Sequence, residues 1–430
     1  MARDIPTPDG ETSWHALQAL LRERHPYAAV EIFHRALGDV FRITLPGFRP
    51  IFMAGPHAAR FVLVEARESF NWRNENDPVT ELLDHGMLVV DGEEHDHLRG
   101  LMNPALSRRR VDGYLDIMLR RTDEITVGWA DGATVDMLVE MRKITLLALM
   151  EALFDVDLAP ELDRLWGPVL SAIRYVSPGL WMLWRGVPRP QFDGRIRQLD
   201  EYLFRIIAER RERLERDSEA GDLLSVLIQA GLPDRRVRDQ MLTMLIAGHD
   251  TNTALLAWAL ALLGQHPEAL ARSTAEVRAT LGEARPEIEG INQLEYVALV
   301  LKEALRLYPP IHLGSRVAAA DLEFNGYPIP RGERVVYSIY LTQRDPAYWD
   351  EPARFIPERH TGRSAPYTWI PFGGGPRNCI GSAFGMLEAK VVLARVLQQF
   401  DVELVEPAIR PRMAATLEPQ PGVRMRGGRV

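Results

Sequence analysis

The feature that most constrains the fold is a glycine-rich loop that carries the only cysteine of this 430-residue chain. The loop reads Phe372-Gly-Gly-Gly-Pro-Arg-Asn-Cys379-Ile-Gly381, and the apolar stripe that follows predicts a helix to about Phe400. Glycine lets backbone N–H groups approach the sulfur, and the helix directs its positive end toward the same atom. Both effects lower the pKa of a thiol, and the thiolate is the nucleophilic and metal-binding form. The loop therefore predicts a reactive or metal-binding sulfur.

Three interpretations of Cys379 are open. A lone cysteine is often a small buried apolar residue, although the glycines and Arg377 disfavour that interpretation here. A catalytic cysteine would need a histidine base, and the loop contains none, although the fold could bring one from elsewhere. An axial ligand to haem iron needs only the loop itself.

Composition excludes several classes of protein. The chain is 46% apolar and 26% charged, as expected of a soluble globular protein, and its net charge of −8 argues against nucleic-acid binding. The N-terminus does not resemble a secretory signal, and no apolar stretch is clean enough to span a membrane. A single cysteine fits a reducing compartment. We expect a cytoplasmic protein, with at most weak peripheral contact with a membrane.

Hydrophobic periodicity predicts long helices and small patches of strand, in one domain over residues 1–430. The predicted helices cover residues 91–103, 111–129, 137–154, 162–175, 192–216, 222–230, 234–265, 267–281 and 291–308. Strand patterns predict a hairpin at residues 40–45 and 51–54, a small sheet within 317–339 and a last hairpin closed near Gly422. Residues 346–371 show no period and predict an irregular, ordered segment.

The helix predicted over residues 234–265 has a polar interruption at Gly248-His-Asp-Thr251. Glycine in a helix interior costs about 1 kcal/mol relative to alanine. A threonine hydroxyl can bond to the carbonyl one turn earlier and open the helix locally. The interruption is a solvated patch, a packing kink, or a proton relay in which Thr251 binds a small oxygen species and Asp250 connects it to solvent.

Two further pairs share helix faces. Glu303 and Arg306 stand three apart, and a buried arginine must be paired, with Arg359 as a third member. His95 and Arg99 stand four apart and predict an anion-binding face. His95 and His97 face different ways, which argues against a metal site there. Each pair alone also fits an ordinary solvated helix.

Taken together, these features resemble the cytochrome P-450 family. Phe372, Gly375, Arg377, Cys379 and Gly381 match its haem-binding signature at every fixed position. The segment Ala247–Thr251 resembles the oxygen-activation motif, Glu303-x-x-Arg306 and Phe355-x-Pro-Glu-Arg359 the family's triad, and His95-x-x-x-Arg99 its propionate-binding pair. The resemblance runs from about Pro26 to the C-terminus. It implies a mainly α fold with small β-sheets, shaped as a triangular prism, with a long central helix over the haem.

The resemblance also implies roles for individual residues. Cys379 would be the proximal thiolate of haem b, and Thr251 and Asp250 would be catalytic residues that supply protons during oxygen activation. The other expected haem contacts are Phe372, Gly375, Gly381, Ala247 and the propionate-binding His95, Arg99, Arg316 and Arg377. The expected substrate pocket contains Leu245, Ala247, Leu313, Ala415 and Thr416. Asn252 departs from the family pattern, since a hydroxyl residue often follows the threonine.

The activity that the resemblance implies is insertion of one oxygen atom from O2 into a lipophilic substrate, by hydroxylation or epoxidation. Electrons from NAD(P)H would arrive through a separate ferredoxin or flavodoxin and its reductase, since the chain ends soon after the haem domain would end. Arg108-Arg109-Arg110 is a candidate docking site for an acidic redox partner, although a solvated loop fits it equally well.

Several questions stay open from sequence. A haem-thiolate enzyme that uses peroxide or isomerises oxygenated lipids, and a non-catalytic haem sensor, are the alternatives. The segment Leu180-Trp-Met-Leu-Trp184 would belong to the access lid. We expect a monomer.

Overall fold

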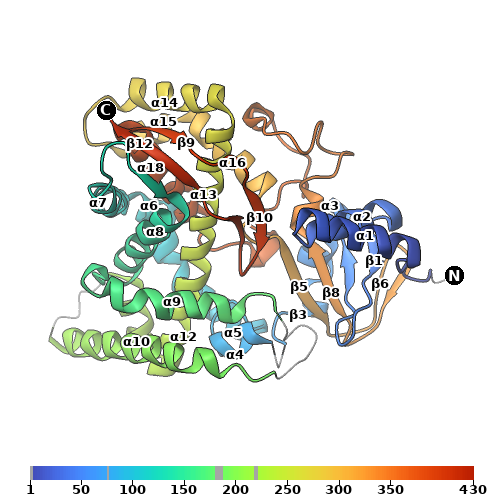
Figure 1. Cartoon of the computed structure of the whole chain (residues 1–430). Helices are drawn as coiled ribbons and strands as arrows, with labels where there is room; N and C mark the ends of the chain where they lie inside the picture. The colour runs from blue at the N-terminus through green and yellow to red at the C-terminus, as the bar shows by residue number, and fades with distance from the viewer. Residues whose placement is uncertain (1–2, 75–76, 180–186, 217–220) are drawn as a thin grey trace.

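The computed structural model describes residues 3–74, 77–179, 187–216 and 221–430. The segment 180–184, predicted to belong to an access lid, lies outside the described residues. Helices make up most of the fold, and the strands gather into small sheets at its side and its C-terminal end (Figure 1). The predicted mainly α architecture is confirmed. No helix within the described ranges has the length and apolar character that crossing a membrane requires.

Most predicted helices appear with nearly the expected bounds. They are α5 (Gly92–Met102), α8 (Met137–Phe154), α9 (Leu162–Val176), α10 (Pro190–Arg216), α11 (Leu223–Gln229), α14 (Pro267–Leu281) and α18 (Ser382–Gln399). The structure adds the helices α1 (Gly10–Glu23), α2 (Tyr27–Leu37), α3 (Gly55–Arg60), α4 (Pro78–Leu83) and α17 (Ile339–Thr342).

Two predicted helices are each split in two. Residues 111–129 fall into α6 (Arg108–Asp112) and α7 (Leu115–Thr126), and residues 291–308 fall into α15 (Ile288–Gln293) and α16 (Glu295–Leu307). The second break has a visible cause. The carboxylate of Glu276 in α14 accepts hydrogen bonds of 2.7 and 2.9 Å from the N–H groups of Tyr296 and Val297, and so caps α16 from another helix. Sequence periodicity contains no sign of such a tertiary cap.

The central helix runs through the middle of the helical region (Figure 1). It consists of α12 (Asp234–Met244), a π-helical turn η6 (Leu245–His249) and α13 (Asp250–Gln265). Gly248 lies in the π-turn, where a Cβ atom would overlap the side chain of Leu149 on α8. The glycine thus permits close approach of α8 to the central helix, and π-turns of this kind occur frequently at functional sites.

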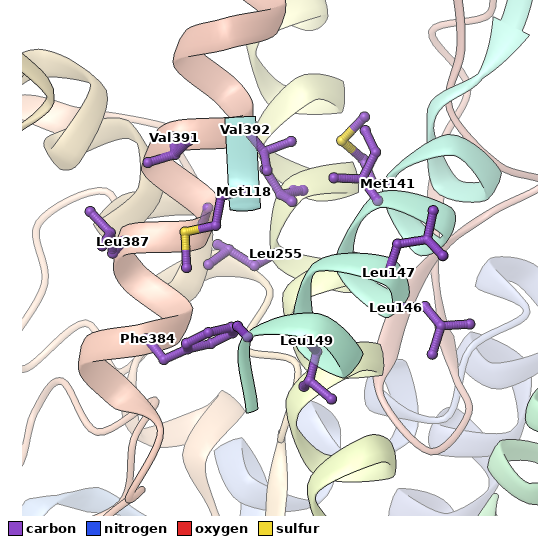
Figure 2. Close-up of a cluster of buried hydrophobic side chains, with 14 of the residues drawn as sticks. Met118, Met141, Leu146, Leu147, Leu149, Leu255, Phe384, Leu387, Val391 and Val392 are labelled. Carbon is purple, nitrogen blue, oxygen red and sulfur yellow. The ribbon is translucent and has the colours of Figure 1, made fainter. Parts of the chain in front are cut away.

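The core between the helices is apolar. Figure 2 shows Met118 of α7, Met141 of α8, Leu255 of α13 and Phe384 of α18 among its buried side chains. All four are at most 3% exposed. Burial of each such side chain contributes about 1.5–3 kcal/mol, so this core fixes how α8, α13 and α18 lie relative to one another.

The largest sheet has the strand order β1-β2-β8-β5-β3. Its strands are β1 (Val40–Arg42), β2 (Ile51–Met53), β3 (Phe70–Asn71), β5 (Leu313–Ala318) and β8 (Arg334–Ser338). The β2–β8 pair is parallel and the others are antiparallel. The predicted hairpin of β1 and β2 is confirmed, and β6 (Leu322–Phe324) and β7 (Tyr327–Ile329) form a second one around Asn325 and Gly326, both with positive φ.

The prediction of a hairpin closed at Gly422 is wrong. The strands on either side of Gly422, β11 (Leu417–Gln420) and β12 (Arg424–Arg429), belong to different sheets. Strand β11 pairs with β10 (Arg410–Met413), while β12 pairs with β9 (Phe400–Leu404) and β4 (Thr134–Asp136). A glycine marks a turn in the chain, but the strands it joins are chosen by long-range pairing.

Candidate active site

The cysteine loop is held by its own backbone. The N–H of Cys379 donates to the carbonyl of Phe372 at 2.8 Å, and the N–H of Asn378 donates to that of Gly375 at 3.1 Å. Gly375 has φ of +65°, and a Cβ atom there would lie 2.5 Å from the carbonyl oxygen of Leu63. Only glycine suits both the conformation and the contact. The N–H of Gly381 points a hydrogen bond at the sulfur.

The predicted lowering of the thiol pKa is wrong for the free side chain. Burial raises the pKa of Cys379, and the Gly381 N–H and the charge of Arg99 offset only part of this effect. Cys379 as a whole residue is nevertheless exposed, so part of its surface is open to a ligand. A thiol of this kind ionises on binding a cation, because the cation supplies the charge that the loop lacks.

A cluster of positive charge lies beside the loop. Arg316 is only 3% exposed, and its guanidinium lies 3.4 Å from the ring centroid of Trp72. Arg377 faces the same ring at 5.2 Å and forms a 3.3 Å ion pair with Asp91. Arg99 donates to the carbonyl and to the side-chain oxygen of Asn378, both at 2.9 Å. The structure thus brings Arg99, Arg316 and Arg377 to the cysteine loop and its surroundings.

These cations lack sufficient counter-charge. Burial lowers the pKa of Arg316, and burial and the charge of Arg316 lower that of Arg377 to about 10 in spite of Asp91. Burial and Arg377 likewise lower the pKa of His95, whose Nδ1 lies 2.9 Å from Asp96. Among the residues that the structure describes, no carboxylate lies within ion-pair distance of Arg316. The cluster is suited to bind a ligand that carries carboxylates.

The predicted opening of the central helix at Thr251 is confirmed. Its hydroxyl donates to the carbonyl of Ala247 at 2.6 Å, within the π-turn. Ile246, Ala247, Gly248 and Thr251 are partly exposed, whereas residues 252–263 are buried. Solvent or a ligand can therefore reach the central helix at this turn.

Asp250 is buried and does not face solvent directly. Its Oδ1 lies 3.0 Å from Nη2 of Arg142, and its Oδ2 accepts a 2.8 Å hydrogen bond from the hydroxyl of Thr416. Arg142 also bonds Glu418 at 2.8 Å. The expected route from Asp250 to solvent therefore meets an ion-pair network, which sequence reasoning missed because its members lie more than 100 residues apart.

The predicted pocket residues fall into two groups. Ala247, Leu313 and Ala415 are partly exposed, as a ligand contact requires. Leu245 is 1% exposed, and the next residue, Ile246, is partly exposed instead, because one step along a helix turns the side chain by about 100°. Thr416 is 2% exposed, and its hydroxyl is engaged by Asp250. Both assignments to the pocket are therefore corrected.

The expected triad meets in the structure and includes a fourth member. Glu303 bonds Arg306 twice at 2.8 Å, Arg359 at 3.0 Å and His360 at 2.9 Å. Burial alone would raise the pKa of Glu303, but Arg306 and His360 outweigh it and lower that pKa to about 2. Arg306 also donates to the carbonyls of residues 343, 352 and 354, and so fixes the irregular segment that leads to the cysteine loop.

Asn252, the departure from the family pattern, connects the central helix to the helix after Cys379. Its Nδ2 donates to Oε2 of Glu388 on α18. Oε1 of Glu388 is buried without a hydrogen-bond partner, and burial raises the pKa of Glu388 to about 8. Glu388 therefore holds a proton in the neutral range, which is how a fully buried carboxyl avoids an unpaired charge.

Comparison with known proteins agrees with this geometry. The sequence profile of the cytochrome P-450 family matches residues 6–423. Cyclooctatin synthase of Streptomyces melanosporofaciens is 30% identical over 429 residues, covering 95% of this chain and 91% of that protein. Cyclooctat-9-en-7-ol 5-monooxygenase of the same organism is 30% identical over 390 residues, covering 85% and 83%. The crystal structure of the cytochrome P450DA heme domain matches with a TM-score of 0.87 and 26% identity, over 100% of this chain and 98% of that one.

A haem-thiolate oxygenase is the class that this fold and site define. The chain belongs to the cytochrome P-450 family. It is a cytochrome P-450 monooxygenase, and haem iron is its cofactor. The residues present fit that cofactor: an exposed cysteine, a cationic cluster short of anions, and a glycine where the loop meets Leu63.

Proposed function

We propose that this protein inserts one oxygen atom of O2 into a lipophilic organic substrate, by hydroxylation or epoxidation. The observation that carries the proposal is the Cys379 loop, in which an exposed cysteine lies beside buried cations that are short of counter-charge. Haem b fits both, since its iron takes an axial thiolate and its two propionates are anions. Electrons would come from NAD(P)H.

Different residues of the chain would have different roles in this reaction. Cys379 would hold the haem iron, with the Gly381 N–H polarising its sulfur, while Arg99, Arg316, Arg377 and His95 would bind the propionates. A thiolate-ligated haem, when bound, supplies the iron chemistry that favours cleavage of the O–O bond. Thr251 would hold and pass a proton at its Oγ1, which now bonds the Ala247 carbonyl.

Asp250 would replenish that proton from its place beside Thr251. The apolar residues around the π-turn would exclude water from the site.

An apolar substrate is supported by the side chains that stay partly exposed near the π-turn and the β5 strand. These are Ile246, Ala247, Leu313 and Ala415, together with Ile311, which is 42% exposed. Ligand pockets are mainly apolar, with few polar groups. The similar monooxygenase named above acts on cyclooctat-9-en-7-ol, an unsaturated alcohol by its name. We propose a substrate with a comparable apolar skeleton.

A separate ferredoxin or flavodoxin is proposed as the electron donor. Helix α6, which contains Arg108 and Arg109, packs against α18, the helix that follows Cys379. Arg108 donates to the side chain of Asn292 at 3.2 Å, and Lys390 of α18 donates to the carbonyl of the same residue at 3.2 Å. Burial, together with the charge of Arg108, lowers the pKa of Lys390 to about 8. An acidic partner would relieve this repulsion.

Arg110 contributes less to that patch than predicted. Its guanidinium donates to the carbonyl of Gly221 at 2.7 Å and lies over the ring of Tyr114. Substitution of both Arg108 and Arg109 by Glu should raise the KM for an acidic ferredoxin about tenfold, since each cation removed weakens association in low salt. Substrate binding should not change. Arg35→Glu on α2 is the control, and equal KM values in both variants would contradict the docking site.

The haem proposal is tested on purified protein supplied with hemin. The ferrous carbonyl adduct of the wild-type protein should absorb at the long wavelength typical of thiolate ligation, and that band should be lost in Cys379→Ser at unchanged fold. Turnover with NADPH and a surrogate reductase should exceed turnover with peroxide. A wild-type adduct without the long-wavelength band would overturn the assignment.

A further inference from the structure

The side chain of Asn252 links two helices that carry different parts of the site. Asn252 follows Thr251 directly on the central helix and is only 5% exposed. Its Nδ2 donates to Oε2 of Glu388 on α18, and that helix begins three residues after Cys379. The amide therefore connects the residue next to Thr251 with the helix that follows the cysteine loop.

Gly385 of α18 makes room for this amide. A Cβ atom at residue 385 would lie 3.0 Å from Oδ1 of Asn252 and 3.6 Å from its Cγ and Nδ2. The amide would then have to move by a few tenths of an ångström. It cannot do so freely, because Nδ2 is bonded to Glu388, one turn further along the same helix. Glycine inside a helix costs about 1 kcal/mol relative to alanine, so the space at residue 385 is retained at the expense of helix stability.

The contacts continue from Gly385 to the sulfur. The N–H of Gly385 donates to the carbonyl of Gly381 at 2.8 Å, and the N–H of Gly381 points a hydrogen bond at the sulfur of Cys379. Every step from Asn252 to the sulfur thus runs through backbone atoms or through one short, buried amide. Close-packed groups of this kind transmit a displacement, because no long flexible side chain lies between them to absorb it.

The central helix has two anchors directly after Thr251. The π-turn lies before this residue, and the Thr251 hydroxyl bonds the carbonyl of Ala247 within it. After it, Thr253 bonds Thr145 of α8 at 2.9 Å, and Asn252 bonds α18. Only the second anchor leads to the helix next to Cys379. Hydrogen bonds have a preferred direction, whereas apolar packing between the helices does not.

We propose that Asn252 is a positioning residue that, together with Gly385 and Glu388, sets where Thr251 lies relative to the iron held by Cys379. The inference deepens the proposed function and rests on it, since Thr251 passes a proton there. Asn252 transfers no proton itself, because its amide does not titrate. Its role is to hold the neighbouring hydroxyl at a fixed distance from the reacting atoms, which proton transfer requires.

Two substitutions at the contact should be strongly non-additive. Gly385→Ala should displace the amide of Asn252, and Thr251 with it. Asn252→Ser removes the atoms that the new Cβ would meet, so Gly385→Ala should have no further effect in that background. Gly194→Ala is the matched control, because Gly194 lies within helix α10 and a Cβ atom there has nothing within 4 Å.

The measurement is the infrared C–O stretching frequency of the ferrous carbonyl adduct of the holoenzyme. Carbon monoxide binds the iron on the side away from Cys379, and its stretching frequency responds to the polar groups beside it. Gly385→Ala should shift this frequency from that of wild type and Gly194→Ala, while Asn252→Ser and the double variant should coincide. Equal shifts on adding Gly385→Ala to both backgrounds, or no shift in either, would overturn the inference.

Glu388 supplies a second comparison, which holds even if Gly385→Ala takes up no haem. Glu388→Gln keeps a side-chain oxygen that accepts from Asn252, whereas Glu388→Leu removes the acceptor. A shift of the C–O frequency in the leucine variant alone supports the inference, and equal frequencies in the two variants contradict it. A protein that shows the expected shifts but forms no product from any substrate counts against the proposed function alone.

Discussion

Glu303 provides the sharpest test of how this fold is held together. Its side chain is fully buried and accepts five hydrogen bonds, from Arg306 twice, Arg359, His360 and the N–H of Ile356. These donors lower its pKa from 4.5 to about 2. Such a lowering corresponds to about 3 kcal/mol of stabilisation at neutral pH.

Replacement by Gln keeps the shape but removes the charge. Arg306 would then be a fully buried cation without a carboxylate, a situation that costs about 3–5 kcal/mol. We expect Glu303→Gln to lower the free energy of unfolding by at least about 3 kcal/mol at pH 7. Because Arg306 also holds the segment before the cysteine loop, haem content should fall as well.

The pH dependence follows from the sign of the shift. A carboxyl whose pKa is lower in the folded state stabilises the fold above its unfolded pKa, here 4.5, and loses that contribution as the pH falls toward about 2. The difference in unfolding free energy between wild type and Glu303→Gln should therefore be constant at neutral pH. It should shrink as the pH drops from 4.5 toward about 2.

Urea unfolding followed by tryptophan fluorescence, at matched haem occupancy and several pH values, measures this difference. Glu358→Gln is the control, because Glu358 is 47% exposed in its pair with Arg272, and exposed pairs contribute about 0–1 kcal/mol. If the free energy of unfolding of Glu303→Gln at pH 7 lies within about 1 kcal/mol of that of the control, the argument that buried Arg306 needs the Glu303 carboxylate is refuted.

Three further predictions follow from particular contacts. Gly375→Ala should abolish haem binding, because the new Cβ would meet the Leu63 carbonyl. Gly373 has a similar φ of +69° but no neighbour within 4 Å, so Gly373→Ala should lower the free energy of unfolding by only about 1–2 kcal/mol. Equal haem contents in the two variants would contradict the steric argument. Glu388→Gln should stabilise the protein increasingly as the pH rises from 4.5 toward about 8. The reason is that the wild-type carboxyl keeps its proton in the folded protein but loses it in the unfolded chain. A pH-independent difference in urea midpoint would show that Glu388 is charged in the folded protein. Tyr175→Phe should speed ligand entry and exit in stopped-flow Soret measurements, because the hydroxyl of Tyr175 bonds Glu81 of α4 at 2.7 Å and its ring contacts Arg189, which precedes α10. Tyr348→Phe is the control. Equal rates in the two variants would show that the Tyr175 hydroxyl does not restrain ligand exchange.

Local pattern predicted most of the secondary structure. The helices α8 and α14 have the expected bounds, because the apolar period and the flanking residues agree along each segment. The opening at Thr251 was also predictable, since the hydroxyl bonds a carbonyl only four residues earlier. In contrast, α15 and α16 are separated by a cap from Glu276, and the strands beside Gly422 pair with distant partners.

The cysteine loop shows the same difference between what local sequence predicts and what long-range packing decides. Resemblance to the family's haem-binding signature identified Cys379, its glycines and Arg377 as one motif. The pKa of the thiol was predicted wrongly, because burial depends on every element that packs around the sulfur, whereas the sequence displays only the loop and its helix.

The sequence by itself determined where most of the helices form, which cysteine is the candidate ligand of the cofactor, and which residues can pair within one or two turns. Only the tertiary structure decided the partners of Asp250, the fourth contact of Glu303 and the neutral state of Glu388. The physical reason is range. Periodicity and capping act over a few residues, while the charge that an acid retains depends on burial and on partners that can lie more than a hundred residues away in the chain.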